Sequence, residues 1–309
     1  MVELHRRQHG VSIRTDIAVG AADDIEVRRI TVVNETNRPR SLSFTSYAEV
    51  VLAPARDDAR HLAFSKLFVE ARHVPALDGL VLTRRPRDPD AHFPVVMHRL
   101  IADSASVSCA GFETDRERFL GRNGSVRRPR GLEEGLSGSQ GTPLDPIMAL
   151  AAQVELAPYA TEQLAFVTIA GPSRLSVDET AARYDTLASF EWLLSDAHAE
   201  AEREAGRLGL SAARLAELQA LLSSLLAPHA GLRATPAQVA ANRLGQPGLW
   251  GLGISGDHPL LLLETVAGNP GTLLADLVRA HQLWRRRGAA VDLVLLSRAA
   301  TGYRDDAWE

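Results

Sequence analysis

The stretch from Phe112 to Arg122 holds the densest set of side chains that could bind a ligand. Three arginines and three acids lie there among two phenylalanines and a leucine. Guanidinium groups bind carboxylates and phosphates in a fixed geometry, and sugar hydroxyls pair well with Arg and Asp. The candidate binding residues are therefore Asp115, Arg116, Arg118 and Arg122. A solvated ion-pair network on the surface would have the same composition, so both interpretations stay open at this point.

A second candidate follows a glycine-rich segment. Gly251–Gly256 has the spacing G-x-G-x-x-G. A dinucleotide-binding loop needs a strand before this motif and a helix after it, whereas here Pro247 precedes it and an apolar, strand-like run follows. The segment predicts a tight turn into that strand, with Asp257 and His258 as candidates for polar contacts at its mouth.

Other catalytic patterns are missing from the sequence. It contains no G-x-S-x-G nucleophile elbow, and its paired acids Glu133 and Glu134 are sequence neighbours in a predicted loop. The single cysteine, Cys109, lies in a strand-like run, which favours an inert, buried thiol. We therefore expect no metal and no cofactor.

Composition narrows the class of protein and of partner. The 309 residues are 45% hydrophobic and 23% charged, as is usual for a globular protein with roughly two domains. The net charge of −4 gives no support to a nucleic-acid partner. The N-terminus lacks the apolar core of a secretory signal, and no run reaches the ~18 apolar residues of a membrane span. We expect no direct membrane contact in this span and a cytoplasmic or cytoplasm-facing location.

Alternating apolar and polar residues predict an almost purely β region from about Gly10 to Gly171. Asn, Asp, Pro and Gly separate the alternating runs, which is typical of antiparallel hairpins. Nine strands without intervening helix predict a large antiparallel sandwich. The predicted strands are Val11–Val19, Glu26–Val33, Leu42–Leu52, Phe64–Arg72, Leu80–Arg84, Val95–Ile101, Ser106–Phe112, Ile147–Leu156 and Gln163–Ile169. The long Gly-, Pro- and Arg-rich segment Arg122–Pro146 is predicted to drape over the sandwich as a loop.

The periodicity then becomes helical. Ser176–Glu179 has the form of a capping box, and helix is predicted to Gly206 and again over Ser211–Ala227. An apolar run at Leu260–Val266, an amphipathic helix at Thr272–Arg287 and a second apolar run at Val291–Leu296 predict a βαβ unit with parallel strands. We expect a β-sandwich domain over residues 1–174, a helical linker over 175–245 and an incomplete α/β segment over 246–309.

Several separated stretches resemble the bacterial cyclic β-1,2-glucan synthases. The likeness is to their glycosyltransferase-36-type region, which is related to the cellobiose phosphorylases of glycoside hydrolase family 94. It extends from about residue 10 to residue 303. The stretches that carry it are Asp24–Val32, Thr45–Pro54, Ala63–Glu70, Glu113–Arg122, Leu144–Pro146 and Leu249–Pro259.

This resemblance implies a mainly β fold, an antiparallel β-supersandwich followed by linker helices and a βαβ segment. It also implies a membrane-anchored parent enzyme whose phosphorylase-like region cleaves β-1,2-glucan by inverting phosphorolysis. In the family, the general-acid Asp and the phosphate-binding residues belong to an (α/α)6 barrel. The helices predicted here are too few for that barrel, so the resemblance assigns the catalytic role to no position of this chain.

Three functions remain open. The leading hypothesis is a non-catalytic sandwich and linker portion of a glucan synthase-like protein that supports or contacts a β-glucan oligosaccharide. The second is a structural module that docks onto the remaining domains of the parent enzyme, including the (α/α)6 barrel, or onto a second subunit. The third is a part of an active inverting phosphorylase, with Asp115 or Asp257 as the acid.

Overall fold

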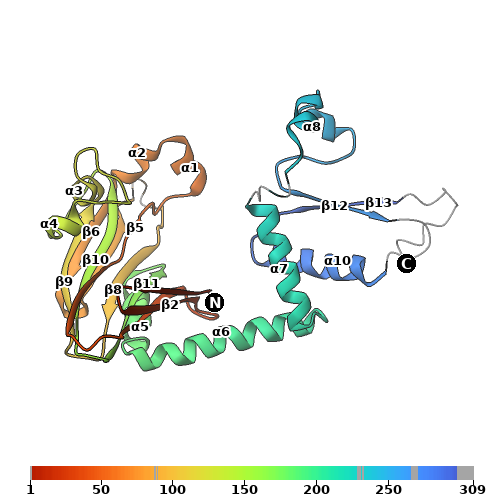
Figure 1. Cartoon of the computed structure of the whole chain (residues 1–309). Helices are drawn as coiled ribbons and strands as arrows, with labels where there is room; N and C mark the ends of the chain where they lie inside the picture. Colours follow the sequence, from red (N-terminus) through yellow and green to blue (C-terminus); the bar gives the residue numbers. More distant parts are fainter. Residues whose placement is uncertain are drawn as a thin grey trace. The chain divides into compact units, whose positions relative to one another are not determined.

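The chain folds as two compact units, Met1–Ala199 and Glu200–Glu309 (Figure 1). Each unit has its own hydrophobic core. The computed structural model describes residues 2–86, 88, 90–227, 231, 233–265 and 271–297.

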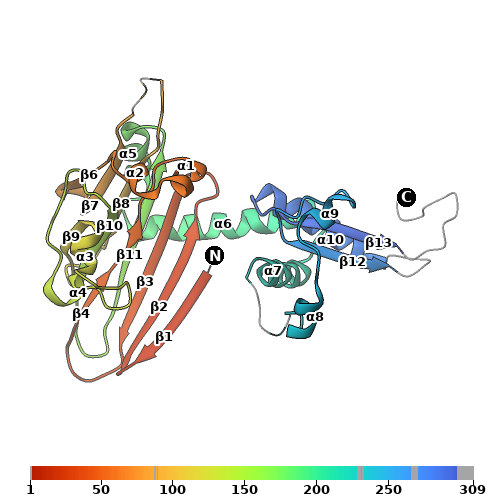
Figure 2. The ribbon, with the colours of Figure 1, turned by 90° about the horizontal axis from the view of Figure 1, so that it is seen from above.

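The first unit is built on a seven-stranded antiparallel sheet. Its strand order is β1-β2-β3-β11-β8-β7-β6, so β1 and β6 form the two edges. Figure 2 shows β1, β2 and β3 side by side at one end of this sheet. The strands are β1 (Val2–Gln8), β2 (Val11–Val19), β3 (Ile25–Asn34), β6 (Val69–Val74), β7 (Gly79–Arg84), β8 (Val95–Ile101) and β11 (Thr161–Gly171).

A smaller four-stranded sheet lies against it. Its centre is β10 (Pro146–Leu156), which pairs along one edge with β9 (Val107–Asp115). Along its other edge, β10 pairs with β4 (Arg40–Thr45) and then with the short β5 (Ala48–Glu49). All of these pairings are antiparallel, and the predicted antiparallel sandwich is confirmed.

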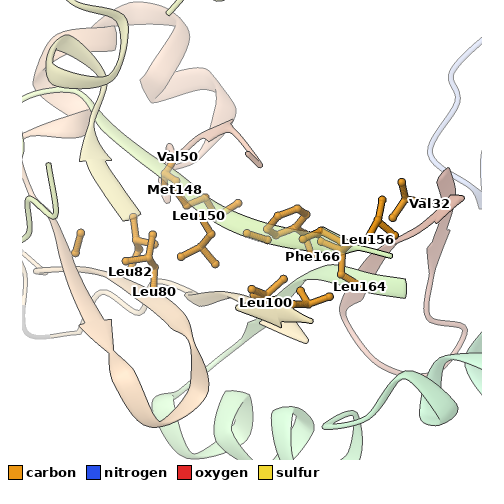
Figure 3. Close-up of a cluster of buried hydrophobic side chains, with 14 of the residues drawn as sticks. Val32, Val50, Leu80, Leu82, Leu100, Met148, Leu150, Leu156, Leu164 and Phe166 are labelled. Carbon is orange, nitrogen blue, oxygen red and sulfur yellow. The ribbon is translucent and has the colours of Figure 1, made fainter. Parts of the chain in front are cut away.

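The core of the sandwich lies between the two sheets (Figure 3). Leu80, Leu82 and Phe166 from the large sheet meet Met148 and Leu150 from β10. Removing each such side chain from water contributes about 1.5–3 kcal/mol, which makes this the main stabilising layer of the unit.

The opposite face of the large sheet is covered by two helices, α5 (Arg174–Arg183) and α6 (Leu187–Arg207). Val177 of α5 and Phe190 of α6 pack there against Val167 of β11. β11 is therefore buried on both faces, which explains why it is a nearly continuous apolar run and does not alternate.

Two short helices interrupt the predicted strands. α1 (Ala55–Arg60) and α2 (Leu62–Lys66) occupy the chain after β5, and the strand expected over Phe64–Arg72 begins only at Val69. Pro54 precedes α1, and Asp57 and Asp58 lie in its first turn, where carboxylates favour a helix. Strand β1 was also not predicted. The remaining short helices of this unit are η1 (Pro75–Leu77), α3 (Arg116–Leu120) and α4 (Gly131–Glu134).

Helix α5 begins earlier than the predicted capping box. Its N-cap is Ser173, whose hydroxyl accepts a hydrogen bond from the backbone N–H of Ser176. The capping interaction proposed at Ser176 is therefore wrong, because Ser176 already lies inside the first turn.

The second unit contains the predicted parallel βαβ arrangement. β12 (Leu260–Thr265) and β13 (Asp292–Ser297) pair in parallel and are joined through α10 (Gly271–Arg286). Leu261 and Leu263 pack with α10 and α7, whereas Leu260 and Leu262 on the opposite face are exposed. The other helices of this unit are α7 (Ala212–Leu226), α8 (Pro236–Ala241) and α9 (Pro247–Trp250). Val266 and residues 298–309, included in our predicted segments, lie outside the described residues.

Candidate functional site

Charged side chains from four separate segments meet at one end of the small sheet. The Lys66 ammonium lies 2.6 Å from an Asp145 carboxylate oxygen, and the Arg116 guanidinium contacts Glu49 at 3.0 Å. The Arg116 Nε also donates to the Tyr47 hydroxyl at 3.2 Å. We call these five residues the Lys66 cluster.

The fold brings the Lys66 cluster together through short elements at the ends of strands. Lys66 ends α2, Arg116 begins α3 directly after β9, and Asp145 immediately precedes β10. Tyr47 and Glu49 come from the region of β5. The family resemblance was carried by the stretches that supply these residues, so stretches far apart in the sequence converge here.

The charged groups of the Lys66 cluster are paired with one another. The Lys66 side chain is only 9% exposed, while Asp145 and Arg116 are about one third exposed. The hydrogen bond to Tyr47, followed by the charge of Glu49, raises the pKa of Arg116 above its ordinary value. Burial raises the pKa of Tyr47 above its ordinary value; the hydrogen bond from Arg116 opposes this rise and the hydrogen bond to Glu49 adds to it. The charges are thus held by one another, and the arrangement suits positioning better than proton transfer.

Two aromatic contacts hold this end of β9 and α3 in place. Phe119 is buried and stacks on the Tyr47 ring at 5.0 Å between centroids, and Phe112 stacks on His73 at 4.1 Å. The charged residues of this segment therefore lie between two aromatic contacts, at the end of β9 and in the short helix α3.

The buried carboxylate of Glu113 anchors the long loop. One oxygen accepts from the backbone N–H groups of Thr114 and Asp115, and the two oxygens also accept from the hydroxyls of Ser137 and Ser139. Burial raises the pKa of Glu113, but these hydrogen bonds outweigh it and leave the pKa below its ordinary value. The loop also pairs with the edge strand β6 through Ala71 and Gly141. It therefore drapes over the sandwich as predicted.

The candidate residues of the Phe112–Arg122 stretch have different environments. Asp115 is the N-cap of α3 and accepts from the backbone N–H groups of Glu117 and Arg118, at 2.9 and 3.4 Å. Arg116 belongs to the Lys66 cluster. The side chains of Arg118 and Arg122 are exposed.

Asp257 and His258 belong to the second unit. The Asp257 carboxylate accepts from the Gln246 side chain at 2.9 Å. His258 lines a hollow of about 590 Å³ together with His281, Arg285 and the start of β13. Asp257 thus makes a polar contact near the start of β12, and the binding role expected of Asp257 and His258 stays a prediction. Within the ranges that the structure describes, no group of three or more His, Cys, Asp or Glu side chains is arranged to hold a metal ion.

Several residues of the Lys66 cluster and the Glu113 anchor escaped our site prediction. Composition did carry one signal, because Lys66 is the only lysine among 34 basic residues in a chain that otherwise uses arginine. The pairing of Lys66 with Asp145 joins residues far apart in sequence, which neither spacing nor periodicity could predict.

Among the residues described, no helix has both the length and the apolar character needed to cross a bilayer.

Comparison with known proteins identifies the family of the first unit. The model of the family described as "Glycosyl hydrolase 94, supersandwich domain" matches residues 1–187. The cyclic beta-(1,2)-glucan synthase NdvB of Rhizobium meliloti (strain 1021) is 32% identical over 293 residues, which cover 93% of this chain and 10% of that protein. The chain thus spans about a tenth of the length of this relative.

Solved structures give weaker similarities. A polysaccharide lyase matches with a TM-score of 0.35 and 13% identity, over 58% of this chain and 22% of its own. A putative kojibiose phosphorylase from the human microbiome matches with a TM-score of 0.29 and 8% identity, over 65% of this chain and 20% of its own. TM-scores this low carry no argument about function.

Proposed function

Because this chain belongs to the glycosyl hydrolase 94 supersandwich family, we propose that it is a non-catalytic, carbohydrate-associated part of a longer cyclic β-1,2-glucan synthase-like protein. In this role the sandwich supports or contacts a β-glucan, while an (α/α)6 barrel elsewhere in the parent protein performs the chemistry. The parent protein would hold this span in the cytoplasm or at the cytoplasmic face of the inner membrane.

The observation that carries the proposal is the internal pairing of the candidate acids and bases. A general acid must deliver its proton to a leaving group within hydrogen-bond reach. The Asp115 carboxylate instead caps α3, and the Asp257 carboxylate accepts a hydrogen bond from the Gln246 side chain. These roles favour a scaffold over a catalytic centre.

A phosphorolysis assay tests the non-catalytic claim. The chain is incubated with linear β-1,2-glucan and inorganic phosphate, and the release of α-glucose 1-phosphate is followed. We expect no release above that of a protein-free blank. Turnover at ordinary enzyme rates, lost on Asp115→Asn or Asp257→Asn, would instead support the active-phosphorylase alternative.

Docking without glycan binding is the second candidate function, and the uncovered face of the β12–β13 sheet favours it. Leu260, Leu262 and Leu296 are each more than one third exposed there. Two parallel strands are normally covered on both faces, and a further part of the parent protein would supply the cover.

Titration with millimolar glucan separates this candidate from the first. Docking alone predicts no glucan binding, together with association with the parent's remaining domains that Leu262→Glu abolishes. Self-association lost on the same substitution would identify a second copy of the chain as the partner. Saturable glucan binding by a monomer favours the first proposal.

A further inference from the structure

A polar hollow lies at the β6 edge of the large sheet, away from the Lys66 cluster. Its volume is about 660 Å³, within the range of about 300–1,000 Å³ typical of sites for small ligands. Four segments line it: strand β6, strand β7, the start of α5, and the part of the long loop that pairs with β6. Its polar lining consists of Glu70, Arg72, Thr83, Gln140, Thr142 and Arg174.

The strand register sets the floor of the hollow. Glu70 lies directly opposite Thr83, and Arg72 lies opposite Val81. Side chains two residues apart on a strand, and their direct cross-strand partners, project from the same face. Val81 belongs to the core layer beneath α5 and α6, so this is the helix-covered face of the sheet, at the point where the cover ends.

The wall of the hollow is fixed by backbone contacts. The Ala71 N–H donates to the Gly141 carbonyl at 2.7 Å, and the Gly141 N–H donates back at 2.8 Å. The Gln140 side chain accepts from the His73 N–H at 3.1 Å. The Glu113 anchor holds the preceding part of the same loop, so this wall is formed before any ligand arrives.

The polar groups of the floor are available to a ligand. Within the described part of the chain, the side chains of Glu70, Arg72 and Thr83 make no hydrogen bond or ion pair, and neither does that of Thr142. On β3, by contrast, the same acid and base two residues apart, Glu26 and Arg28, pair with each other at 2.7 Å.

The balance of charge favours a neutral ligand. The negative charge of Glu70 offsets the positive charge of Arg72. The Arg174 guanidinium already donates to both carboxylate oxygens of Asp178 at 2.8 Å. An anion would be attracted by a single unpaired guanidinium, that of Arg72, and repelled by the Glu70 carboxylate beside it. A polyhydroxyl ligand can donate to Glu70 and accept from Arg72 at once.

We propose that this hollow binds a short, neutral gluco-oligosaccharide through Glu70, Arg72 and Thr83. The inference rests on the proposed function, and it assigns the carbohydrate contact to the β6–β7 edge and not to the Phe112–Arg122 stretch.

Calorimetric titration of the whole chain with linear β-1,2-linked gluco-oligosaccharides tests this site. Glu70→Gln and Arg72→Gln should each raise the dissociation constant by about tenfold or more, because each removes a charged hydrogen-bonding partner. The matched controls Glu26→Gln and Arg28→Gln, on another strand of the same sheet, should leave the constant unchanged. Should either floor variant fail to fold, amide NMR shifts of the unaltered chain replace it, and those of Arg72, Thr83 and Thr142 should move on titration.

The outcomes separate this inference from the function on which it rests. Glucan binding that is unaffected by the floor variants, or amide shifts confined to other strands, would overturn the hollow as the site and leave the carbohydrate role intact. No binding at millimolar glucan would overturn both. Binding of inorganic phosphate in competition with the oligosaccharide would overturn the neutral ligand class.

Discussion

His98 is a buried hydrogen-bonding residue that joins the two sheets. Its ring nitrogens lie 2.8 Å from the Ser46 hydroxyl and 2.9 Å from the Thr168 hydroxyl. Burial, helped by the nearby charge of Arg28, lowers the pKa of His98 from 6.5 to about 4. The imidazole of His98 is therefore neutral in the folded protein at neutral pH.

The stability of the first unit should fall as the pH drops from about 6.5 to about 4. In this window the unfolded chain binds a proton at His98 that the folded chain does not, so acid favours unfolding. Between about pH 7 and about pH 5 the loss should be about 2 kcal/mol. Denaturant titrations at both pH values measure it. His98→Gln should remove this slope and the exposed His92→Gln should keep it, whereas equal slopes in all three proteins would contradict the assignment.

The Lys66 cluster predicts an asymmetric response to substitution. Asp145→Ala leaves the nearly buried Lys66 ammonium without its closest partner and should lower the free energy of unfolding by about 3 kcal/mol. Adding Lys66→Met should recover much of that loss, because the buried charge is then gone. Glu133→Ala, which breaks only the exposed Arg128–Glu133 pair, should cost about 0.5 kcal/mol or less. Thermal and denaturant unfolding measure all three values. A double variant with a lower free energy of unfolding than Asp145→Ala alone would contradict a buried, unpaired Lys66 charge as the cause of the loss.

At this scale the sequence located a charged stretch correctly but not the roles of its residues. The density of Arg and acids predicted that Asp115 and Arg116 bind a ligand, which stays a prediction; in the structure Asp115 caps α3 and Arg116 pairs with Glu49. Neither their partners nor the importance of Glu113 follows from composition, because the Ser137 and Ser139 hydroxyls reach Glu113 from a distant loop.

At the level of elements, the Glu113 side chain is one of the main attachment points of the long loop. Glu113 connects β9 to residues 137–139 of the loop, and β6 pairs with Gly141 a few residues further on. Without this loop the edge of β6 would be exposed. Covering such an edge protects a sheet from pairing with other chains.

Glu113→Gln should therefore loosen the loop. The amide presents N–H groups where the carboxylate accepts hydrogen bonds, so one or more buried donors lose their acceptor, at a cost of about 2 kcal/mol. We expect faster proteolysis within residues 135–143 and weaker glucan binding at the β6 edge. Glu117→Gln, at an exposed position of α3, is the control. Unchanged proteolysis in the Glu113 variant would show that the loop is held by other contacts.

Elements were predictable where one periodicity dominates. The apolar runs and helix of the βαβ segment were found nearly to the residue, because a single pattern, apolar run or helical period, extends through each of them. Phe64 and Leu67 were assigned to a strand on the apolar character of their neighbourhood, and both are substantially exposed around the end of α2. Short helices in connections leave too few turns for a helical period to appear.

For the whole molecule, the separation of the cores predicts two folding units. Among the residues that the structure describes, the sandwich clusters contain none beyond Leu194, and the core of the second unit begins at Ala205. A protein limited to residues 1–199 should keep the fold, the His98-linked pH dependence and the glucan affinity of the full chain. Circular dichroism, denaturant titration and calorimetry test the three expectations. Loss of folding in this fragment would show that the second unit is required for the first.

The family resemblance and the strand periodicity together predicted the overall architecture. They did not predict the buried layer between the large sheet and helices α5 and α6. In β3, Val27 packs beneath the helices, whereas Ile30 and Val32 face the small sheet. A strand that is buried on both faces loses the alternation that distinguishes them.

A single NMR sample measures the central claim most directly. The isotope-labelled chain is mixed with linear β-1,2-glucan and phosphate, and protein amide shifts and phosphorus signals are recorded together over time. We predict saturable shifts at the β6–β7 edge while inorganic phosphate remains the only phosphorus signal. A growing glucose 1-phosphate signal, or amide shifts that stay unchanged at millimolar glucan, would contradict a non-catalytic, carbohydrate-contacting role.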